Sequence, residues 1–119
     1  VVEQGRAGEV YNVGGGAELP NLQVIEEICR AVDEAFEADP ALAEAFPDAP
    51  AANGGESASL KTHVTDRLGH DRRYAIDCDK IMGELGYAPQ HDFAEALDAT
   101  VRWYLDNAAW WRAIQAKGA

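Results

Sequence analysis

The chain is small and acidic: its 119 residues include 21 Asp and Glu against 10 Lys and Arg, for a formal net charge of −11. This length suits one small domain, and a hydrophobic fraction of 47% is ordinary for a globular protein. An acidic surface repels phosphate backbones, so nucleic acid is not expected as a partner. No apolar run approaches the roughly 20 residues that cross a bilayer, so no membrane partner is expected either.

The start of the sequence carries neither an initiating Met nor a signal-peptide pattern. We therefore expect a piece of a longer protein. Cys29 and Cys78 are the only cysteines and lie in unlike contexts, which predicts free thiols and a cytoplasmic location.

The first half of the chain combines a strand pattern, a helix pattern and a long irregular stretch. Residues 9–13 are predicted to form a short strand, which three glycines then end. Apolar residues next recur at helical spacing and predict a helix over residues 22–36, capped by Asn21. Prolines, alanines and acids in residues 37–59 predict a long acidic loop, with one helical turn near 41–45.

Two further extended segments follow. Residues 60–65 and 73–76 are predicted to form short strands on either side of a polar turn. Asp77 is then predicted to cap a short helix that Gly86 ends.

The last helix is predicted over residues 93–106, because Asp92 and Glu95 match the Asp-x-x-Glu capping box. A further turn or two is expected to reach Ile114. Four aromatic residues crowd this end, and we expect them to pack in a core or between domains: Trp103, Tyr104, Trp110 and Trp111.

Three helices and three short strands indicate a small α/β domain of α+β-like character. The strands are too short and too few to form a sheet of their own. We therefore expect a larger half to be missing.

No catalytic centre is recognisable in the sequence. The glycines at 14–16 do not open directly into a helix, because Leu19 and Pro20 intervene, and this excludes a dinucleotide-binding loop. The chain has no Tyr-x-x-x-Lys and no Gly-x-Ser-x-Gly. Its three histidines lack metal-ligand spacing, so no metal site is expected.

The basic segment from Asp66 to Tyr74, Asp-Arg-Leu-Gly-His-Asp-Arg-Arg-Tyr, supports two interpretations. Arginine presents a planar fork of donors that suits phosphate oxygens, so Arg67 with His70 could clamp a diphosphate. Alternatively, this is an ion-paired surface loop, in which the arginines are neutralised by neighbouring acids: Asp66, Asp71 and Asp77.

Three segments together resemble one family. Residues 8–15 (Gly-Glu-Val-Tyr-Asn-Val-Gly-Gly), 66–77 and 84–89, the last leading to 100–104, are similar in order and spacing to the end of the dTDP-glucose 4,6-dehydratase family of extended short-chain dehydrogenases. The resemblance covers nearly the whole chain except residues 37–59, which look longer than usual. A second departure is Leu68, where the family pattern usually has proline.

The resemblance implies a parent enzyme, an NAD-dependent lyase that binds NAD on an amino-terminal Rossmann half. The parent oxidises the sugar at C4, eliminates water across C5 and C6, and returns the hydride to C6. Residues 1–119 would be its carboxy-terminal substrate-binding domain, in which Asn12, Arg67 and His70 contact the dTDP part of a dTDP-sugar. We expect this piece alone to bind no cofactor and to be inactive.

Two alternatives remain open on the sequence. The chain could belong to another nucleotide-sugar epimerase or decarboxylase, or it could be a non-enzymatic binding or assembly module. Because a missing half would leave apolar surface uncovered, we also expect self-association into a homo-oligomer or aggregate.

Overall fold

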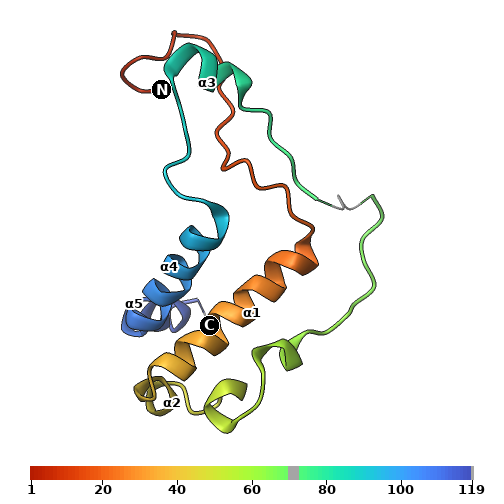
Figure 1. The fold of residues 1–119 in the computed structure, drawn as a ribbon, viewed down its shortest axis with the longest axis vertical. Coiled ribbons are helices and arrows are strands. Elements are labelled where there is room, and N and C mark those ends of the chain that lie inside the picture. The colour runs from red at the N-terminus through yellow and green to blue at the C-terminus, as the bar shows by residue number, and fades with distance from the viewer. Residues whose placement is uncertain (70–72, 119) are drawn as a thin grey trace.

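The computed structural model describes residues 1–69 and 73–118, which form helices joined by long extended segments (Figure 1). The described residues contain no β-strand. The elements, in chain order, are α1 (Asn21–Ala38), α2 (Ala41–Ala45), the 3-10 helices η1 (Pro50–Asn53) and η2 (Ser57–Leu60), α3 (Asp79–Leu85), α4 (Phe93–Asp106) and α5 (Ala108–Gln115).

The long helix α1 confirms the prediction for residues 22–36 and extends it slightly at both ends. The predicted cap is wrong: Pro20 holds the N-cap position, and Asn21 is already the first helical residue. The ring of Pro20 fixes a φ of −59°, which directs the chain into the helix without a side-chain hydrogen bond. Ala31 and Phe36 form the buried part of the apolar stripe.

The segment 37–59 is more ordered than the predicted loop. The expected turn at 41–45 is confirmed as α2, and two 3-10 helices follow it. Both carboxylate oxygens of Asp33 on α1 accept a hydrogen bond from the backbone N–H of Ser57, at 3.0 and 3.2 Å. This contact returns the end of the segment to α1, which the local composition did not indicate.

Helix α4 has the predicted bounds, and its first turn is capped as expected. The Oδ1 of Asp92 accepts a hydrogen bond from the backbone N–H of Glu95 at 2.9 Å. Instead of continuing straight to Ile114, the helix breaks at Asn107 and resumes as α5.

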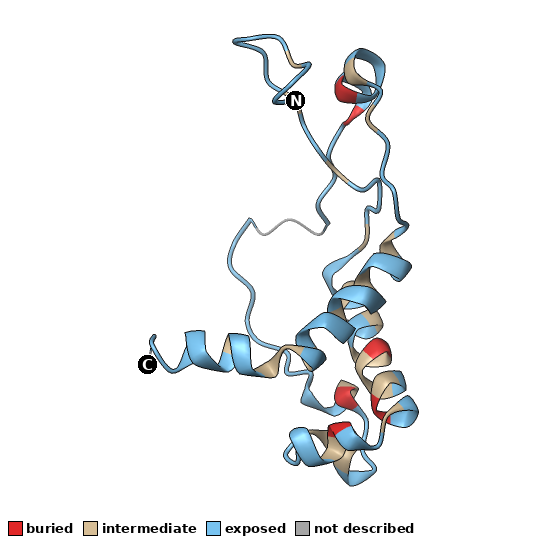
Figure 2. Cartoon of the chain, turned by 90° about the vertical axis from the view of Figure 1, so that its left-hand side faces the viewer, coloured by how far each residue is buried: buried red, intermediate tan, exposed pale blue. Residues whose placement is uncertain are grey.

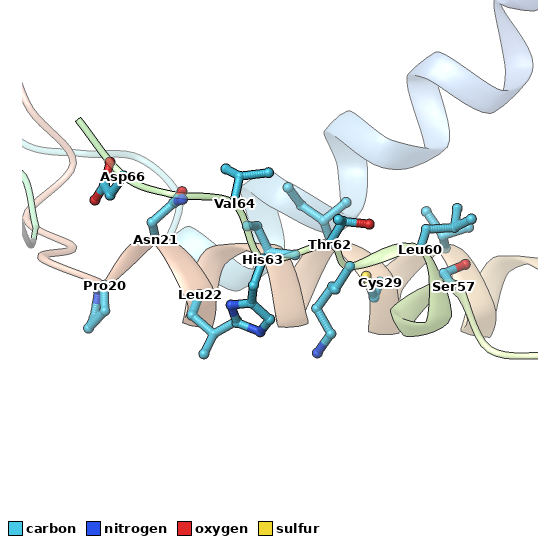
Figure 3. Close-up of a pocket in the computed structure, with 14 residues that line it drawn as sticks. Pro20, Asn21, Leu22, Cys29, Ser57, Leu60, Thr62, His63, Val64 and Asp66 are labelled. Atoms are coloured by element: carbon cyan, nitrogen blue, oxygen red, sulfur yellow. The ribbon is translucent and has the colours of Figure 1, made fainter. Parts of the chain in front are cut away.

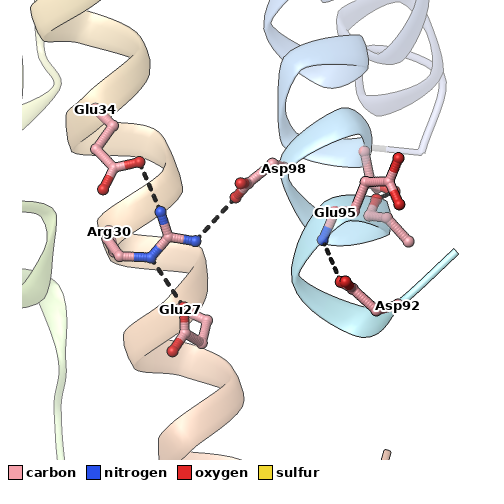
Figure 4. A network of polar contacts seen from close by, with 8 residues as sticks. Glu27, Arg30, Glu34, Asp92, Glu95 and Asp98 are labelled. Carbon is pink, nitrogen blue, oxygen red and sulfur yellow. Dashed lines mark hydrogen bonds and ion pairs between the residues drawn. The ribbon is translucent and has the colours of Figure 1, made fainter.

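Helices α1 and α4 lie side by side and are joined by Arg30 (Figure 4). Its guanidinium pairs with Glu27 and Glu34 on α1, at 2.9 and 2.6 Å, and reaches Asp98 on α4 at 3.0 Å. These hydrogen bonds raise the pKa of Arg30 further above its ordinary value. One cation therefore bridges acids of both helices at their interface.

The aromatic residues at the end of the chain divide into two groups. Trp111 stacks on Phe46, with ring centroids 6.4 Å apart, so the packing expected for it is found. Trp103 and Trp110 make an edge-to-face pair at 5.2 Å but stay 45% and 54% exposed. Within the described residues they therefore pack on each other rather than in a core.

The three predicted strands are wrong for this structure. Residues 9–13, 60–65 and 73–76 form no ladder: Leu60 ends η2, and the other residues are extended. The described residues show one isolated antiparallel bridge, between Pro20 and Arg73. Most of their β-favouring side chains are exposed because no neighbouring strand lies beside them, whereas Tyr11 is half-buried next to Lys80. The described part of the chain is therefore mostly helical, and the α/β class is not seen in it.

The molecule is open rather than compact. Its radius of gyration is 18.4 Å, against about 13.5 Å expected for a compact domain of this length. Within residues 1–69 and 73–118, burial is confined to two small clusters, one where α1 meets α2 and η2 and one around Cys78 and Ile81 at α3 (Figure 2). None of the helices in residues 1–69 and 73–118 has the length and apolar character needed to span a bilayer.

The cap of α4 gives a first test. Replacing Asp92 by Ala leaves the N–H of Glu95 without its acceptor, so Asp92→Ala should lower the free energy of unfolding by about 0.5–2 kcal/mol. Urea denaturation followed by circular dichroism measures the loss. Gln90→Ala, two residues before the cap and exposed, is the matched control and should change stability by much less. Equal effects of the two variants would contradict the assigned cap.

Candidate functional site

The predicted site residues lie on two separate extended segments. Asn12 lies on the segment before α1, and Arg67 lies on the segment between η2 and α3 (Figure 1). The prediction for His70 falls outside the described residues. No hydrogen bond joins Asn12 to Arg67 within the described residues.

Asn12 is anchored next to the start of α3. Its side-chain Nδ2 donates a hydrogen bond to the backbone carbonyl of Asp77 at 3.2 Å. Its side-chain oxygen has no hydrogen-bond partner among the described residues. The residue is exposed, so this amide oxygen can still accept a hydrogen bond from a ligand.

The side chain of Arg67 is exposed, and within the described residues it forms none of the internal ion pairs that one interpretation required. Its backbone N–H is held by Oδ1 of Asp66 at 2.8 Å. The guanidinium forms no ion pair within residues 1–69 and 73–118. All five of its donors are therefore available for an anion.

The other described arginine of the basic segment is paired, but not as proposed. Arg73 reaches Glu18 at 2.9 Å and so holds the chain next to the bridge at Pro20. The carboxylate of Asp77 accepts the backbone N–H of Asp79 at 2.9 Å, at the start of α3. Within the described residues Asp77 therefore pairs with no arginine. Its predicted role as the cap of this helix is wrong, because Cys78 holds the N-cap position of α3 and no side chain caps it.

Gly14 provides a close approach between the two extended segments. A side chain there would place its Cβ 3.3 Å from both Cys78 Sγ and Ile76 Cβ. The Gly14 carbonyl accepts a hydrogen bond from the Tyr87 hydroxyl at 3.1 Å. Because Gly14 packs on its own chain and α1 begins only at Asn21, these glycines do not fit a pyrophosphate-binding loop.

A polar cluster that sequence reasoning missed links the first segment to α3. Lys80 lies 2.6 Å from Glu9 and 4.8 Å from the centre of the Tyr11 ring, and the Tyr11 hydroxyl donates to Glu84 at 2.9 Å. The hydrogen bond with Glu9 raises the pKa of Lys80, and the same contact lowers the pKa of Glu9. Both groups are thus charged at neutral pH. No local sequence pattern predicts this cluster, because the residues that contact each other are about 70 positions apart in the sequence.

The main cavity is an open apolar groove of about 830 Å³ between α1 and residues 57–66 (Figure 3). Aliphatic side chains of the α1 stripe and of the facing segment line it, including Leu22, Ile25, Val32, Leu60 and Val64. Neither Asn12 nor Arg67 is among the lining residues. Cys29 also borders the groove, and both cysteines are free thiols as predicted. The described residues contain no cluster of His, Cys, Asp or Glu suited to a metal ion.

The chain has homologues that carry one enzyme name. It is 41% identical over 110 residues to dTDP-glucose 4,6-dehydratase of Xanthomonas campestris pv. campestris (strain B100), which is 92% of this chain and 28% of that protein. It is 40% identical over 114 residues to the Escherichia coli protein of that name, or 96% of this chain and 28% of the relative. A Shigella flexneri protein of that name is 43% identical over 110 residues, or 92% and 26%. No family model matches the chain.

These matches confirm the resemblance carried by the three motif segments. They also delimit it, because the chain spans only between a quarter and a third of the length of the curated relatives it matches. The comparison is therefore with one part of those proteins.

The close approach at Gly14 gives a second test, with Cys78 as its probe. Gly14→Ala forces its new Cβ against the Cys78 thiol, and overpacking of this kind costs about 1–3 kcal/mol. Alkylation of the buried Cys78 should therefore become several-fold faster, as measured by mass spectrometry. Gly15→Ala is the matched control, because a Cβ at Gly15 meets nothing within 4 Å. If the two variants label Cys78 at the same rate, the packing role of Gly14 is wrong.

Proposed function

We propose, from the homology of this chain with part of dTDP-glucose 4,6-dehydratase, that it is the carboxy-terminal substrate-binding part of such an enzyme. In this proposal the complete protein converts dTDP-glucose to dTDP-4-keto-6-deoxyglucose and water. The chain grips the dTDP diphosphate, and the catalytic groups lie in an amino-terminal NAD-binding half. The identity of about 40% over more than nine-tenths of the chain carries the proposal.

The exposed guanidinium of Arg67 supports a diphosphate-binding role. A planar guanidinium can donate two parallel hydrogen bonds to phosphate oxygens, and it stays charged at every physiological pH. Because no described acid neutralises it, binding a diphosphate would not require breaking an internal ion pair. This is the chemistry expected of Arg67 in the substrate-binding part.

Asn12 and His70 would fix the position of the nucleotide rather than neutralise its charge. The link from Asn12 to the Asp77 carbonyl holds its amide in place, so that its oxygen could accept a hydrogen bond from the ligand. Because Asn12 and Arg67 lie on separate segments, we infer that both segments converge on the nucleotide in the complete protein.

NAD would supply a hydride acceptor and donor when bound to the other half. The glycines at 14–16 do not fit its pyrophosphate, and the chain offers no Tyr-x-x-x-Lys. The role of this chain is therefore to bind and orient the substrate. Its cytoplasmic location and its self-association stay predictions.

The absence of recognisable catalytic groups leads to a direct test. The 119-residue chain, incubated with NAD and dTDP-glucose, should give no 4-keto product above the blank, whereas the protein encoded by its full reading frame should turn over. Product is followed by its absorbance in alkali. Turnover by the short chain would overturn the assignment of all catalytic groups to the other half.

Arg67 can be tested by calorimetry on the full-length protein. Removing a charge-assisted contact costs about 1.5–3 kcal/mol, so Arg67→Ala should weaken dTDP binding by about ten- to a hundredfold. Arg102→Ala is the matched control, because Arg102 pairs with Asp39 and Asp106 on the helical body, and it should bind dTDP normally.

The nucleotide itself separates the dehydratase from its alternatives in the same titrations. Tighter binding of UDP or GDP than of dTDP would favour another nucleotide-sugar enzyme. Unchanged dTDP affinity in Arg67→Ala would remove the proposed diphosphate contact.

A further inference from the structure

The groove between α1 and residues 57–66 exposes an unusual amount of apolar surface for so small a chain. Leu60 is 70% and Val64 is 81% exposed on one wall. Leu22 on α1 is 48% exposed, although it belongs to the stripe that faces the groove. Contiguous apolar surface of this kind marks an interaction site.

The chemistry of the groove favours polypeptide over a polar small molecule. Aliphatic side chains form much of the lining, although it also contains polar residues: Asn21, Ser57, Thr62, His63 and Asp66. The ammonium of Lys61, which also lines the groove, is already paired with Glu26 at 3.7 Å. No buried side-chain N or O atom of the described residues lacks a hydrogen-bond partner. The long aliphatic wall of the groove suits the side chains of a polypeptide better than a sugar or nucleotide, which needs convergent polar groups to orient it.

The wall of the groove also presents an unpaired backbone edge. Residues 62–65 are extended, and they form no backbone–backbone hydrogen bond with any described residue. An exposed extended edge beside an apolar surface is the arrangement to which an incoming strand adds. Main-chain hydrogen bonds would then accompany side-chain burial.

Two facts select the occupant. A second copy of this chain would bring another net charge of −11 to the interface, and like charge opposes association. By contrast, more than two-thirds of each relative's length lies outside the matched part. A covalently attached half also binds without the entropic cost of bringing two molecules together.

We propose that this groove is the docking surface for the NAD-binding half of the complete protein, which fills it with an apolar extended segment that pairs along residues 62–65. This inference rests on the proposed function, since it requires that second half. It assigns the apolar stripe of α1 to an interface between the halves and leaves Asn12 and Arg67 outside that interface.

Cys29 is a natural probe of the groove, because its thiol borders it and is half-buried. The experiment compares the 119-residue chain with the full-reading-frame protein, using iodoacetamide labelling of Cys29 read by mass spectrometry. Hydrogen exchange of the backbone amides at 62–65 is measured in parallel. In the full-length protein we expect both rates to fall at least tenfold.

A pair of variants locates the effect. Val64→Asp places a charge in the docking surface and should return Cys29 labelling in the full-length protein toward the rate of the short chain. Ile114→Asp is the matched control, because Ile114 is an exposed aliphatic residue on α5, 54% exposed and outside the groove. It should leave the labelling slow. If Val64→Asp does not fold, the docking surface is still tested by comparing Cys29 labelling and amide exchange between the wild-type short chain and the wild-type full-length protein.

Equal Cys29 labelling and equal amide exchange in the two wild-type proteins would overturn the docking surface. Protection that appears in the short chain as its concentration rises would assign the groove to a second copy and would also overturn it. Dehydratase activity and dTDP affinity report separately on the proposed function. An active full-length protein with an open groove would thus refute only this inference.

Discussion

A β-strand gains its stability from a neighbour, and the described residues provide almost none. Three segments with strand-like composition, 9–13, 61–65 and 73–76, extend through solvent with a single bridge at Pro20 and Arg73. In isolation, an extended backbone loses conformational entropy without gaining ladder hydrogen bonds or side-chain burial. The open shape, the exposed valines and the unfilled groove all follow from this lack of a partner sheet.

The helices, by contrast, satisfy their backbones locally and need only one partner face each. Arg30 joins α1 to α4 through acids on both helices, and Asp33 draws η2 back to α1. At the other end, Gly14, Cys78 and Tyr87 form a small junction that holds the extended segments to α3. The chain thus consists of a helical body and a junction around α3, connected by segments that bury little.

Sequence patterns predicted what local interactions determine. The bounds of α4 follow from the cap at Asp92, and the end of α3 follows from Gly86, whose φ of 63° suits glycine. The strand patterns were not sufficient to predict β-strands, because a strand must pair with residues that are far away in the sequence. The contact of Lys80 with Glu9 and that of Ser57 with Asp33 could not be predicted either, because each joins residues that are far apart in the sequence. The suitability of Arg67 for phosphate binding could be predicted from its residue type alone. Its position relative to Asn12 could not, because that depends on the fold.

The placement of Arg67 bears on how a substrate would be held. If Arg67 were paired with Asp66 or Asp77, it would have to break that salt bridge before it could bind a phosphate, and the affinity would be reduced by the cost. Instead, Asp77 accepts a hydrogen bond from the backbone N–H of Asp79, Arg73 pairs with Glu18, and the Arg67 guanidinium stays exposed. An exposed cation in a chain with a net charge of −11 attracts an anion only at short range, because the surrounding acids oppose it at distance. Diphosphate selectivity would then depend on what brings the segments of Asn12 and Arg67 together, and the docked second half is the element that can do so.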